Sequence, residues 1–151
     1  MVMRPRIAHI VPSDRIAYFL LSARLAQVRA SGFDVSVICG RVAYGRELEE
    51  KGLQVIHIPF AREIAPIIDA RCAWGLYHTL RQERFDIVHS HNPKGGLLGP
   101  FIGRLARNAT VVHTVHGFLF NENSTGLYHQ LALGVERWTA YWCDHLLFQS
   151  S

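Results

Sequence analysis

Residues 86–106, DIVHSHNPKGGLLGPFIGRLA, join two segments with different patterns. Asp86–Ser90 is a short run with an apolar centre, which predicts a buried strand. Lys94–Ala106 follows after a short loop and predicts a helix rich in glycine, and Thr110–Val115 predicts the next strand. A strand, a helix and a second strand in this order are typical of parallel strands joined by a crossover helix.

The same alternation continues on both sides of this unit. Short apolar runs closed by proline or glycine predict further strands, and apolar residues at helical spacing predict helices. The predicted strands are Ile7–Val11, Val35–Cys39, Gln54–Ile58 and His145–Gln149. The predicted helices are Ile16–Ala30, Glu47–Lys51, one that begins near Pro66, and one through Leu127, Leu131, Val135, Trp138 and Trp142. This order predicts an α/β fold, a doubly wound parallel sheet that is Rossmann-like.

The composition fits one globular domain of 151 residues, because 49% hydrophobic and 19% charged residues exclude intrinsic disorder. The net charge of +4 fits anionic substrates or an anionic membrane surface, although many soluble domains carry the same charge. The three cysteines form no C-x-x-C pair, and neither a signal peptide nor an apolar run of membrane-spanning length is recognisable. We therefore expect reduced thiols, a cytoplasmic location and no nucleic-acid partner.

The loop after the first predicted strand argues against two large enzyme classes. Residues 11–15 read VPSDR and lack the G-x-G-x-x-G turn that a dinucleotide requires, and the sequence has no G-x-x-x-x-G-K-[ST] motif. Ligands of doubly wound sheets bind outside the carboxyl ends of the strands. The loops that we expect to carry function are therefore Ser13–Arg15, Gly40–Arg41, Ser90–Gly96 and His116–Ser124.

Lys94, Gly95 and Gly96 lie at the start of the predicted glycine-rich helix. A lysine beside free backbone N–H groups at a helix N-terminus predicts a phosphate site. The alternative is that the two glycines only allow the helix to pack closely on the sheet, and the two interpretations are compatible.

Four histidines, His89, His91, His113 and His116, lie in or just after two neighbouring predicted strands. A metal site is one interpretation, but no carboxylate precedes Glu122 in these two loops, so we expect no metal. His89 and His113 are more typical of hydrogen-bonded core histidines. His116 is the best placed to face a ligand, since Gly117 after it would let the backbone turn sharply.

Three segments together resemble glycosyltransferase family 4, whose members have the GT-B fold. They are residues 86–99 (DIVHSHNPKGGLLG), residues 112–118 (VHTVHGF), and Glu136–Arg137 followed by residues 143–147 (CDHLL). The order of the segments is also that of the family. The likeness is strongest to the branch that builds bacterial capsular, exopolysaccharide and O-antigen chains.

The resemblance implies that residues 1–151 form the N-terminal, acceptor-binding domain, with the C-terminal donor-binding domain absent from this chain. It implies transfer of a sugar from a nucleotide-sugar to a lipid-linked or glycan acceptor with retention of configuration. Neither a metal nor another cofactor is expected. The implied partners are the donor domain and the two substrates. The positive net charge adds the expectation of a peripheral contact with an anionic membrane surface, at the inner face of the plasma membrane. These 151 residues on their own are expected to be inactive.

The resemblance also assigns residues. His116 matches the family histidine beside the reacting sugar and is the expected catalytic residue. The expected substrate-binding residues are Ser13, Asp14, Arg15, His91, Lys94, Gly95, Gly96, Gly117 and Phe118. Two other functions remain open: a sugar-nucleotide 2-epimerase of the same fold, which would need carboxylates that these loops lack, and a stand-alone module that binds a glycan or a phosphate.

Overall fold

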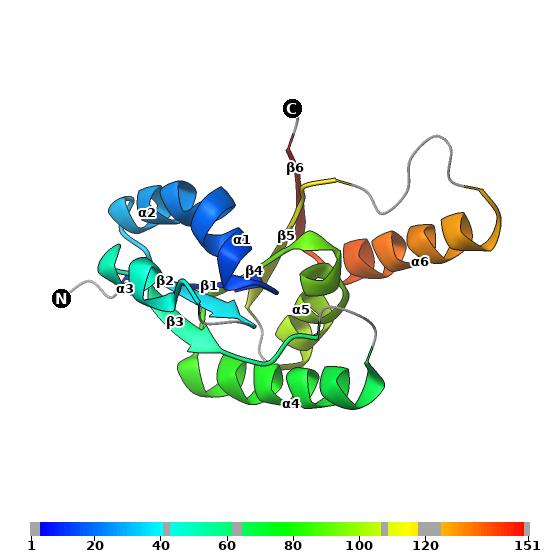
Figure 1. Cartoon of the computed structure of the whole chain (residues 1–151), viewed down its shortest axis with the longest axis horizontal. Coiled ribbons are helices and arrows are strands. Elements are labelled where there is room, and N and C mark those ends of the chain that lie inside the picture. Colours follow the sequence, from blue (N-terminus) through cyan, green and yellow to red (C-terminus); the bar gives the residue numbers. More distant parts are fainter. Residues whose placement is uncertain (1–3, 41–42, 62–64, 107–108, 118–124, 150–151) are drawn as a thin grey trace.

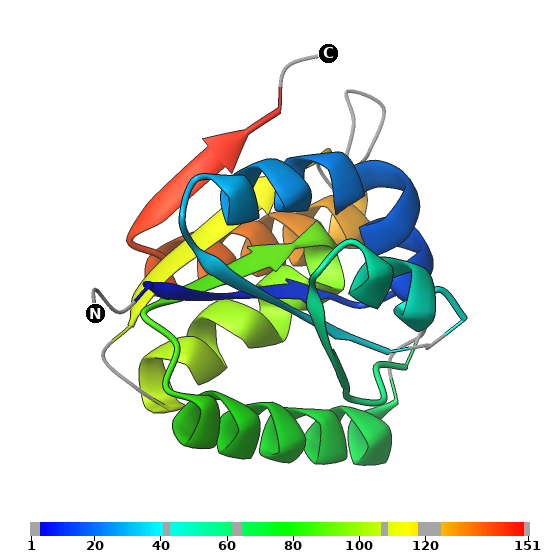
Figure 2. The ribbon, with the colours of Figure 1, turned by 90° about the vertical axis from the view of Figure 1, so that its left-hand side faces the viewer.

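The computed structural model describes residues 4–40, 43–61, 65–106, 109–117 and 125–149. Its centre is a sheet of six parallel strands in the order β3-β2-β1-β4-β5-β6 (Figures 1 and 2). The strands are β1 Arg6–Val11, β2 Asp34–Cys39, β3 Gln54–His57, β4 Ile87–His91, β5 Thr110–Val115 and β6 His145–Phe148. The predicted doubly wound parallel sheet is confirmed, since all six predicted strands are present.

Helices cover both faces of the sheet (Figure 1). On one face, buried leucines of the first helical segment and of α3 pack on Val35 and Val37 of β2. On the other face, Cys72, Leu76 and Leu80 of α4 pack on Ile10 and Val88, and α6 packs on α5. The helical elements are α1 Asp14–Ile16, η1 Ala17–Leu21, α2 Ser22–Ala30, α3 Gly45–Glu50, α4 Pro66–Glu83, α5 Asn92–Ala106 and α6 Gly126–Trp142.

The first helical segment differs from the expected single helix Ile16–Ala30. It begins at Asp14, and η1 is a wider π-helical turn between α1 and α2. The wide turn leaves Phe19 and Leu20 largely exposed, with 59% and 67% of their surface accessible. π-Helical turns inside α-helices are frequent at functional sites, which draws attention to this surface.

The glycine-rich helix also begins earlier than expected, at Asn92 rather than at Lys94. Pro93 explains the difference, because the first turn of a helix accommodates proline without losing a hydrogen bond. At the edge of the sheet, β6 exposes Leu147 and Phe148, 48% and 64% accessible. Within the described stretches, no helix is both long and apolar enough to span a bilayer.

Candidate functional site

The candidate site lies at the carboxyl ends of the central strands. β1 pairs with β2 on one side and with β4 on the other. The strand order therefore runs in opposite directions on the two sides of the β1–β4 pair. This is the switch point of a doubly wound sheet, where ligands of such folds bind. The loop after β1, the start of α5 and the residues that follow β5 all reach this edge (Figure 2).

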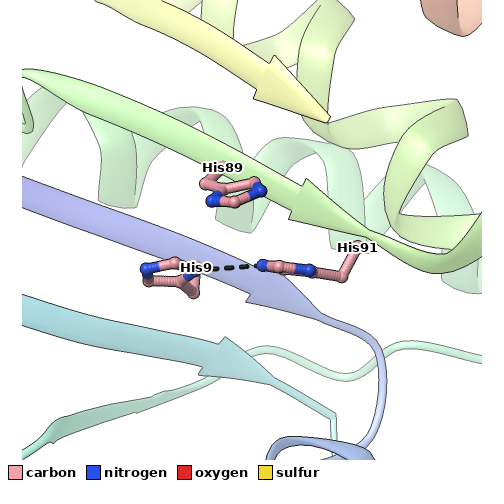
Figure 3. Close-up of side chains that lie close together, drawn as sticks. All are labelled: His9, His89 and His91. Atoms are coloured by element: carbon pink, nitrogen blue, oxygen red, sulfur yellow. Dashed lines mark hydrogen bonds between the residues drawn. The ribbon is translucent and has the colours of Figure 1, made fainter. Parts of the chain in front are cut away.

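Three histidines from β1 and β4 lie together beneath α1 and α2. His9 of β1 is opposite His89 of β4 in the strand register, and His91 lies two residues further on the same face. The Nδ1 atom of His9 is 3.0 Å from Nε2 of His91, and the His89 ring stacks on the His91 ring (Figure 3). Sequence reasoning predicted His89 and His91 here but missed His9.

The hydrogen bonds continue from His91 to the surface. Nδ1 of His91 is 3.1 Å from Nε2 of His116, and Nδ1 of His116 is 2.8 Å from Oε1 of Gln149. An Arg24 guanidinium nitrogen on α2 also donates to this oxygen, at 3.3 Å. We call His9, His91, His116 and Gln149 the histidine chain. It runs from the buried strand β1 to the exposed end of β6.

Burial keeps the inner histidines uncharged. Loss of solvation, together with the charge of His89, lowers the pKa of His9 to about 3. The pKa of His89 falls to about 4, mainly by burial and then through His113 and His116. The pKa of His91 also lies far below its usual value, again first because of burial. At neutral pH these imidazoles can relay hydrogen bonds, but they supply no positive charge for an anion.

His113 lies on the opposite face of the sheet, against α5 and α6. Its Nδ1 atom is 2.8 Å from Oγ of Ser90, and burial lowers its pKa to about 4. His89 is satisfied in a similar way by Thr114, whose Oγ1 is 2.7 Å from Nε2. The interpretation of His89 and His113 as hydrogen-bonded core histidines is confirmed.

The arrangement of the three inner rings argues against a bound metal ion. The ligand atoms of His9, His89 and His91 are within 4.8 Å of one another, which by distance alone resembles a metal site. However, the His89 and His91 rings are stacked, with centroids 4.2 Å apart and planes 30° apart. A metal binds imidazole lone pairs in the ring plane, and stacked rings direct those lone pairs side by side rather than toward one ion.

We therefore expect protein purified without a histidine tag, and dialysed against buffer of low metal content, to contain no stoichiometric metal. Elemental analysis measures this directly, with the variant His89→Gln as the control for adventitious binding. Stoichiometric zinc in the parent protein that disappears in His89→Gln would contradict the expectation.

The first loop divides into a structural and an exposed part. Asp14 is buried, and its carboxylate accepts hydrogen bonds from the backbone N–H groups of Arg15 and Tyr44, both at 2.8 Å. This carboxylate therefore ties the loop to the start of α3. Arg15 is exposed and lines an open pocket of about 300 Å³ with Ile16, Phe19 and Leu20. Substrate contacts of Ser13, Asp14 and Arg15 stay predictions.

Lys94 forms an ion pair with Asp69 of α4, with Nζ 3.0 Å from Oδ1. Partial burial of Asp69 opposes its ionisation, but the backbone N–H of Ala65 and the Lys94 ammonium lower its pKa overall. Lys94 thus joins the starts of α4 and α5 in this structure, and its contact with a phosphate stays a prediction.

Gly95 and Gly96 are packing residues. A Cβ atom on Gly95 would lie 3.2 Å from the carbonyl oxygen of Ile10, and one on Gly96 would lie 2.7 Å from the ring of His113. Both glycines are buried where α5 crosses the sheet. The interpretation that they allow close helix–sheet packing is confirmed, while their role at a phosphate stays a prediction.

We expect Gly96→Ala to lower the free energy of unfolding by about 1–3 kcal/mol, because the new methyl group must displace His113 or α5. The matched control is Gly134→Ala on α6, where a Cβ would meet no atom within 4 Å. Because the open space is counted outside the backbone of α6 itself, that control should be neutral or stabilising by up to roughly 1 kcal/mol, through helix propensity. Urea unfolding of both variants measures the difference, and equal stability of the two would contradict the packing assignment.

Gly117 and Phe118, the two predicted substrate contacts after His116, differ in what the structure describes of them. Gly117 lies outside the left-handed region, which only Gly32, Gly52 and Gly126 occupy among the described glycines. The backbone nonetheless bends at His116 and Gly117, which agrees with the expected sharp turn, and the contact of Gly117 with substrate stays a prediction. Phe118, the last predicted substrate contact, lies outside the described residues.

Two contributors to the site were missed by sequence reasoning. His9 lies within the short apolar run Ile7–Val11 that predicts the first strand, and a buried polar group requires a partner. Its position opposite His89 in a neighbouring parallel strand was the available signal. Gln149 was assigned to the last strand, and its contact with His116 depends on β6 pairing with β5, which the local pattern does not reveal.

This sheet and its switch-point site resemble those of nucleotide-sugar enzymes of the GT-B type. The family model of Glycosyltransferase Family 4 matches residues 19–151. The chain therefore belongs to glycosyltransferase family 4, as the sequence motifs had indicated.

Relatives and solved structures agree with this assignment. The chain is 38% identical over 89 residues to the UDP-Gal:α-D-GlcNAc-diphosphoundecaprenol α-1,3-galactosyltransferase of Escherichia coli, which covers 58% of this chain and 23% of the relative. It is 26% identical over 113 residues to the capsular polysaccharide biosynthesis glycosyltransferase CapM of Staphylococcus aureus, covering 74% and 29%. Thus it spans less than a third of either relative.

The fold alone is shared more widely. The structure of UDP-GlcNAc 2-epimerase from Methanocaldococcus jannaschii superposes with a TM-score of 0.65 at 14% identity, over 98% of this chain and 40% of that one. Epimerases and glycosyltransferases therefore share this domain architecture, and the fold does not discriminate between the two activities.

Proposed function

We propose that this chain is the acceptor-binding domain of a glycosyltransferase of bacterial surface polysaccharide synthesis. The enzyme would transfer a sugar from a nucleotide-sugar to a lipid-linked or glycan acceptor, with retention of configuration. Family membership supports the reaction class. The Escherichia coli and Staphylococcus aureus relatives, whose names state a lipid-linked acceptor and capsule synthesis respectively, support the substrate class.

The observation that carries the acceptor assignment is the pocket at Arg15. It combines one exposed guanidinium with the largely exposed side chains of Phe19 and Leu20 on the π-helical turn. A polyprenyl diphosphate has the same two chemical parts, an anion that pairs with arginine and an apolar chain that contacts such side chains. We accordingly propose that the domain works in the cytoplasm, peripherally at the inner face of the plasma membrane.

The proposed chemistry uses no metal. A nucleoside diphosphate leaves, and positive groups and helix N-termini stabilise its charge. The inner histidines cannot supply that charge, because burial keeps His9, His89 and His91 neutral. In this proposal the donor-side domain holds the diphosphate, while His116 contacts the reacting sugar. The epimerase alternative is less well supported, since both oxygens of the Asp14 carboxylate near this edge accept backbone hydrogen bonds.

Acceptor binding can be measured on this chain directly. We expect it to bind a short-chain polyprenyl diphosphate sugar in titration calorimetry, and Arg15→Ala to weaken binding by about tenfold or more, the effect of losing a charged hydrogen bond of about 1.5–3 kcal/mol. The control is Arg46→Ala, an exposed arginine on α3 that pairs with Glu50. Equal loss in both variants would indicate non-specific charge attraction, and unchanged binding in Arg15→Ala would remove the pocket from the proposal.

We expect the 151-residue chain by itself to show no transferase turnover. The family resemblance implies that a paired-glutamate motif and a basic diphosphate clamp belong to the donor-side domain, and neither occurs in these residues. Release of nucleoside diphosphate from a panel of nucleotide-sugars, with the polyprenyl acceptor present, provides the measurement. Robust turnover by this chain would contradict the proposal that a separate donor-side domain is needed for the reaction.

A further inference from the structure

We infer that the buried pair His9–His91 fixes the tautomer of His116, so that His116 presents an N–H donor at Nδ1 to the substrate. His91 is then a positioning residue and not a substrate ligand. The role of the substrate in this inference rests on the proposed function, whereas the tautomer itself does not.

The direction of the hydrogen bonds can be identified from the contacts of Gln149 at the exposed end of the chain. Arg24 has only donors, so the Gln149 atom that it contacts at 3.3 Å is the amide oxygen. The same oxygen lies 2.8 Å from Nδ1 of His116, and an oxygen without a hydrogen can only accept. His116 therefore carries its proton on Nδ1.

The inner hydrogen bonds follow from this assignment. With its proton on Nδ1, the His116 ring offers a lone pair on Nε2, which accepts from Nδ1 of His91 at 3.1 Å. The Nε2 atom of His91 then accepts from Nδ1 of His9 at 3.0 Å. The pattern with all three protons on Nδ1 satisfies every hydrogen bond of the histidine chain. It leaves Nε2 of His9 as a buried lone pair without a partner among the described residues. The reverse pattern, with the protons on Nε2, would lose the bond to Gln149 and would bury an N–H of His9 that has no acceptor among the described residues.

The two ends of the chain differ in burial. His9 and His91 are 3% and 4% exposed, so their hydrogen bond is held by the core, whereas Gln149 is exposed and can turn away. When Gln149 leaves, Nε2 of His116 is still occupied by His91 and Nδ1–H becomes free. The Gln149 oxygen thus marks the place of a ligand oxygen, and a sugar hydroxyl would accept there. Histidine free in water prefers its proton on Nε2, so the buried pair selects the less common form.

Nuclear magnetic resonance of side-chain nitrogens in the ¹⁵N-histidine-labelled chain tests this at neutral pH. Long-range proton–nitrogen correlations distinguish the two tautomers. We expect the Nδ1–H form for His9, His91 and His116. We expect it to persist for His116 in Gln149→Met, because His91 still donates to Nε2. A change of His116 to Nε2–H in Gln149→Met would show that Gln149 alone sets the tautomer and would overturn the inference.

A matched pair in the Gln149→Met background tests His91 itself. Asparagine in His91→Asn keeps an N–H near the position of Nδ1 and should preserve Nδ1–H on His116, whereas His91→Leu should return His116 to the Nε2–H form. The same tautomer in both double variants would overturn the role of His91. If the leucine variant does not fold, the exposed Gln149→Met variant still decides the question. None of these measurements depends on transferase activity, so they can fail or succeed separately from the proposed function.

Discussion

Below a pH of about 6.5 this domain is expected to lose stability steeply and to unfold cooperatively near a pH of about 5. The cause is a set of four histidines, the buried His9, His91 and His113 and the half-buried His89, each of whose pKa is lowered in the folded state mainly by loss of solvation. In the unfolded chain each would titrate near its ordinary value of about 6.5. Unfolding therefore takes up protons as soon as the pH falls below that value.

The sign of the effect follows from linkage. Above a pH of about 6.5 both states are neutral at these positions and the contribution to stability is complete. From there down to about 4, where His89 and His113 begin to titrate in the fold, the unfolded chain binds more protons and stability falls with pH. At a pH of about 5 each histidine has cost on the order of 2 kcal/mol, and four together cost about 8 kcal/mol. That sum is comparable with the entire stability of a typical domain.

Carboxylates affect the free energy of unfolding at lower pH than these histidines do. The pKa of Asp144 is lowered mainly by the backbone N–H of Val111 and further by Arg104, so its contribution is lost only below the ordinary value of 3.8. Urea unfolding at a series of pH values separates the two ranges. At a pH of about 5 the free energy of unfolding should change by about 5 kcal/mol per pH unit, the value for four protons.

The control compares a desolvated with an exposed histidine. His89→Gln removes one of the four desolvated imidazoles and should reduce this slope by roughly a quarter, whereas His78→Gln, at an exposed position on α4, should reduce it less. A free energy of unfolding that stays flat between a pH of about 7 and about 5 would show that the four histidines are not buried as neutral groups.

The fold could be predicted from local sequence because each strand carries its own signal. Ile7–Val11 and Val35–Cys39 are short apolar runs closed by proline and glycine, and such runs between helical segments leave few alternatives to a parallel sheet. The exact starts of the helices were harder to predict from local sequence. The side chain of Asp14 holds the loop at α1 through a contact with Tyr44, thirty residues away, and no local pattern reports such a contact.

The residues of the site could be predicted only where histidines recur at the ends of neighbouring strands. His89 and His91 alternate within one strand, and His116 follows the next strand, so their common edge could be expected. His9 comes from β1 and Gln149 from the residue after β6. They contact His91 and His116 only because of the strand register, which a local pattern does not contain. Glycines gave an ambiguous signal, since Gly95 and Gly96 suit both a phosphate and close packing, and only the contacts of Gly96 with His113 reveal the packing.

His116→Ala is expected to reduce kcat/KM by about a hundredfold in the protein that joins this domain to a donor-side domain. Loss of one preorganised hydrogen bond to the reacting sugar costs on the order of 3 kcal/mol in the transition state. In the present structure Gln149 and His91 occupy both ring nitrogens of His116, so substrate must replace the exposed Gln149 contact. The imidazole is partly exposed at the end of β5, which places it where a ligand can reach it.

The variant should remain folded with a modest loss of stability. Removing the imidazole leaves the His91 Nδ1–H without its acceptor, at a cost of about 1–3 kcal/mol, less where water enters the space. Thermal unfolding measured beside turnover separates this cost from the catalytic effect, and His78→Ala serves as the control for removal of a surface histidine. A variant that stays folded and retains near-normal turnover would exclude His116 from catalysis. A variant whose lost activity follows its unfolded fraction would instead make His116 a structural member of the histidine chain.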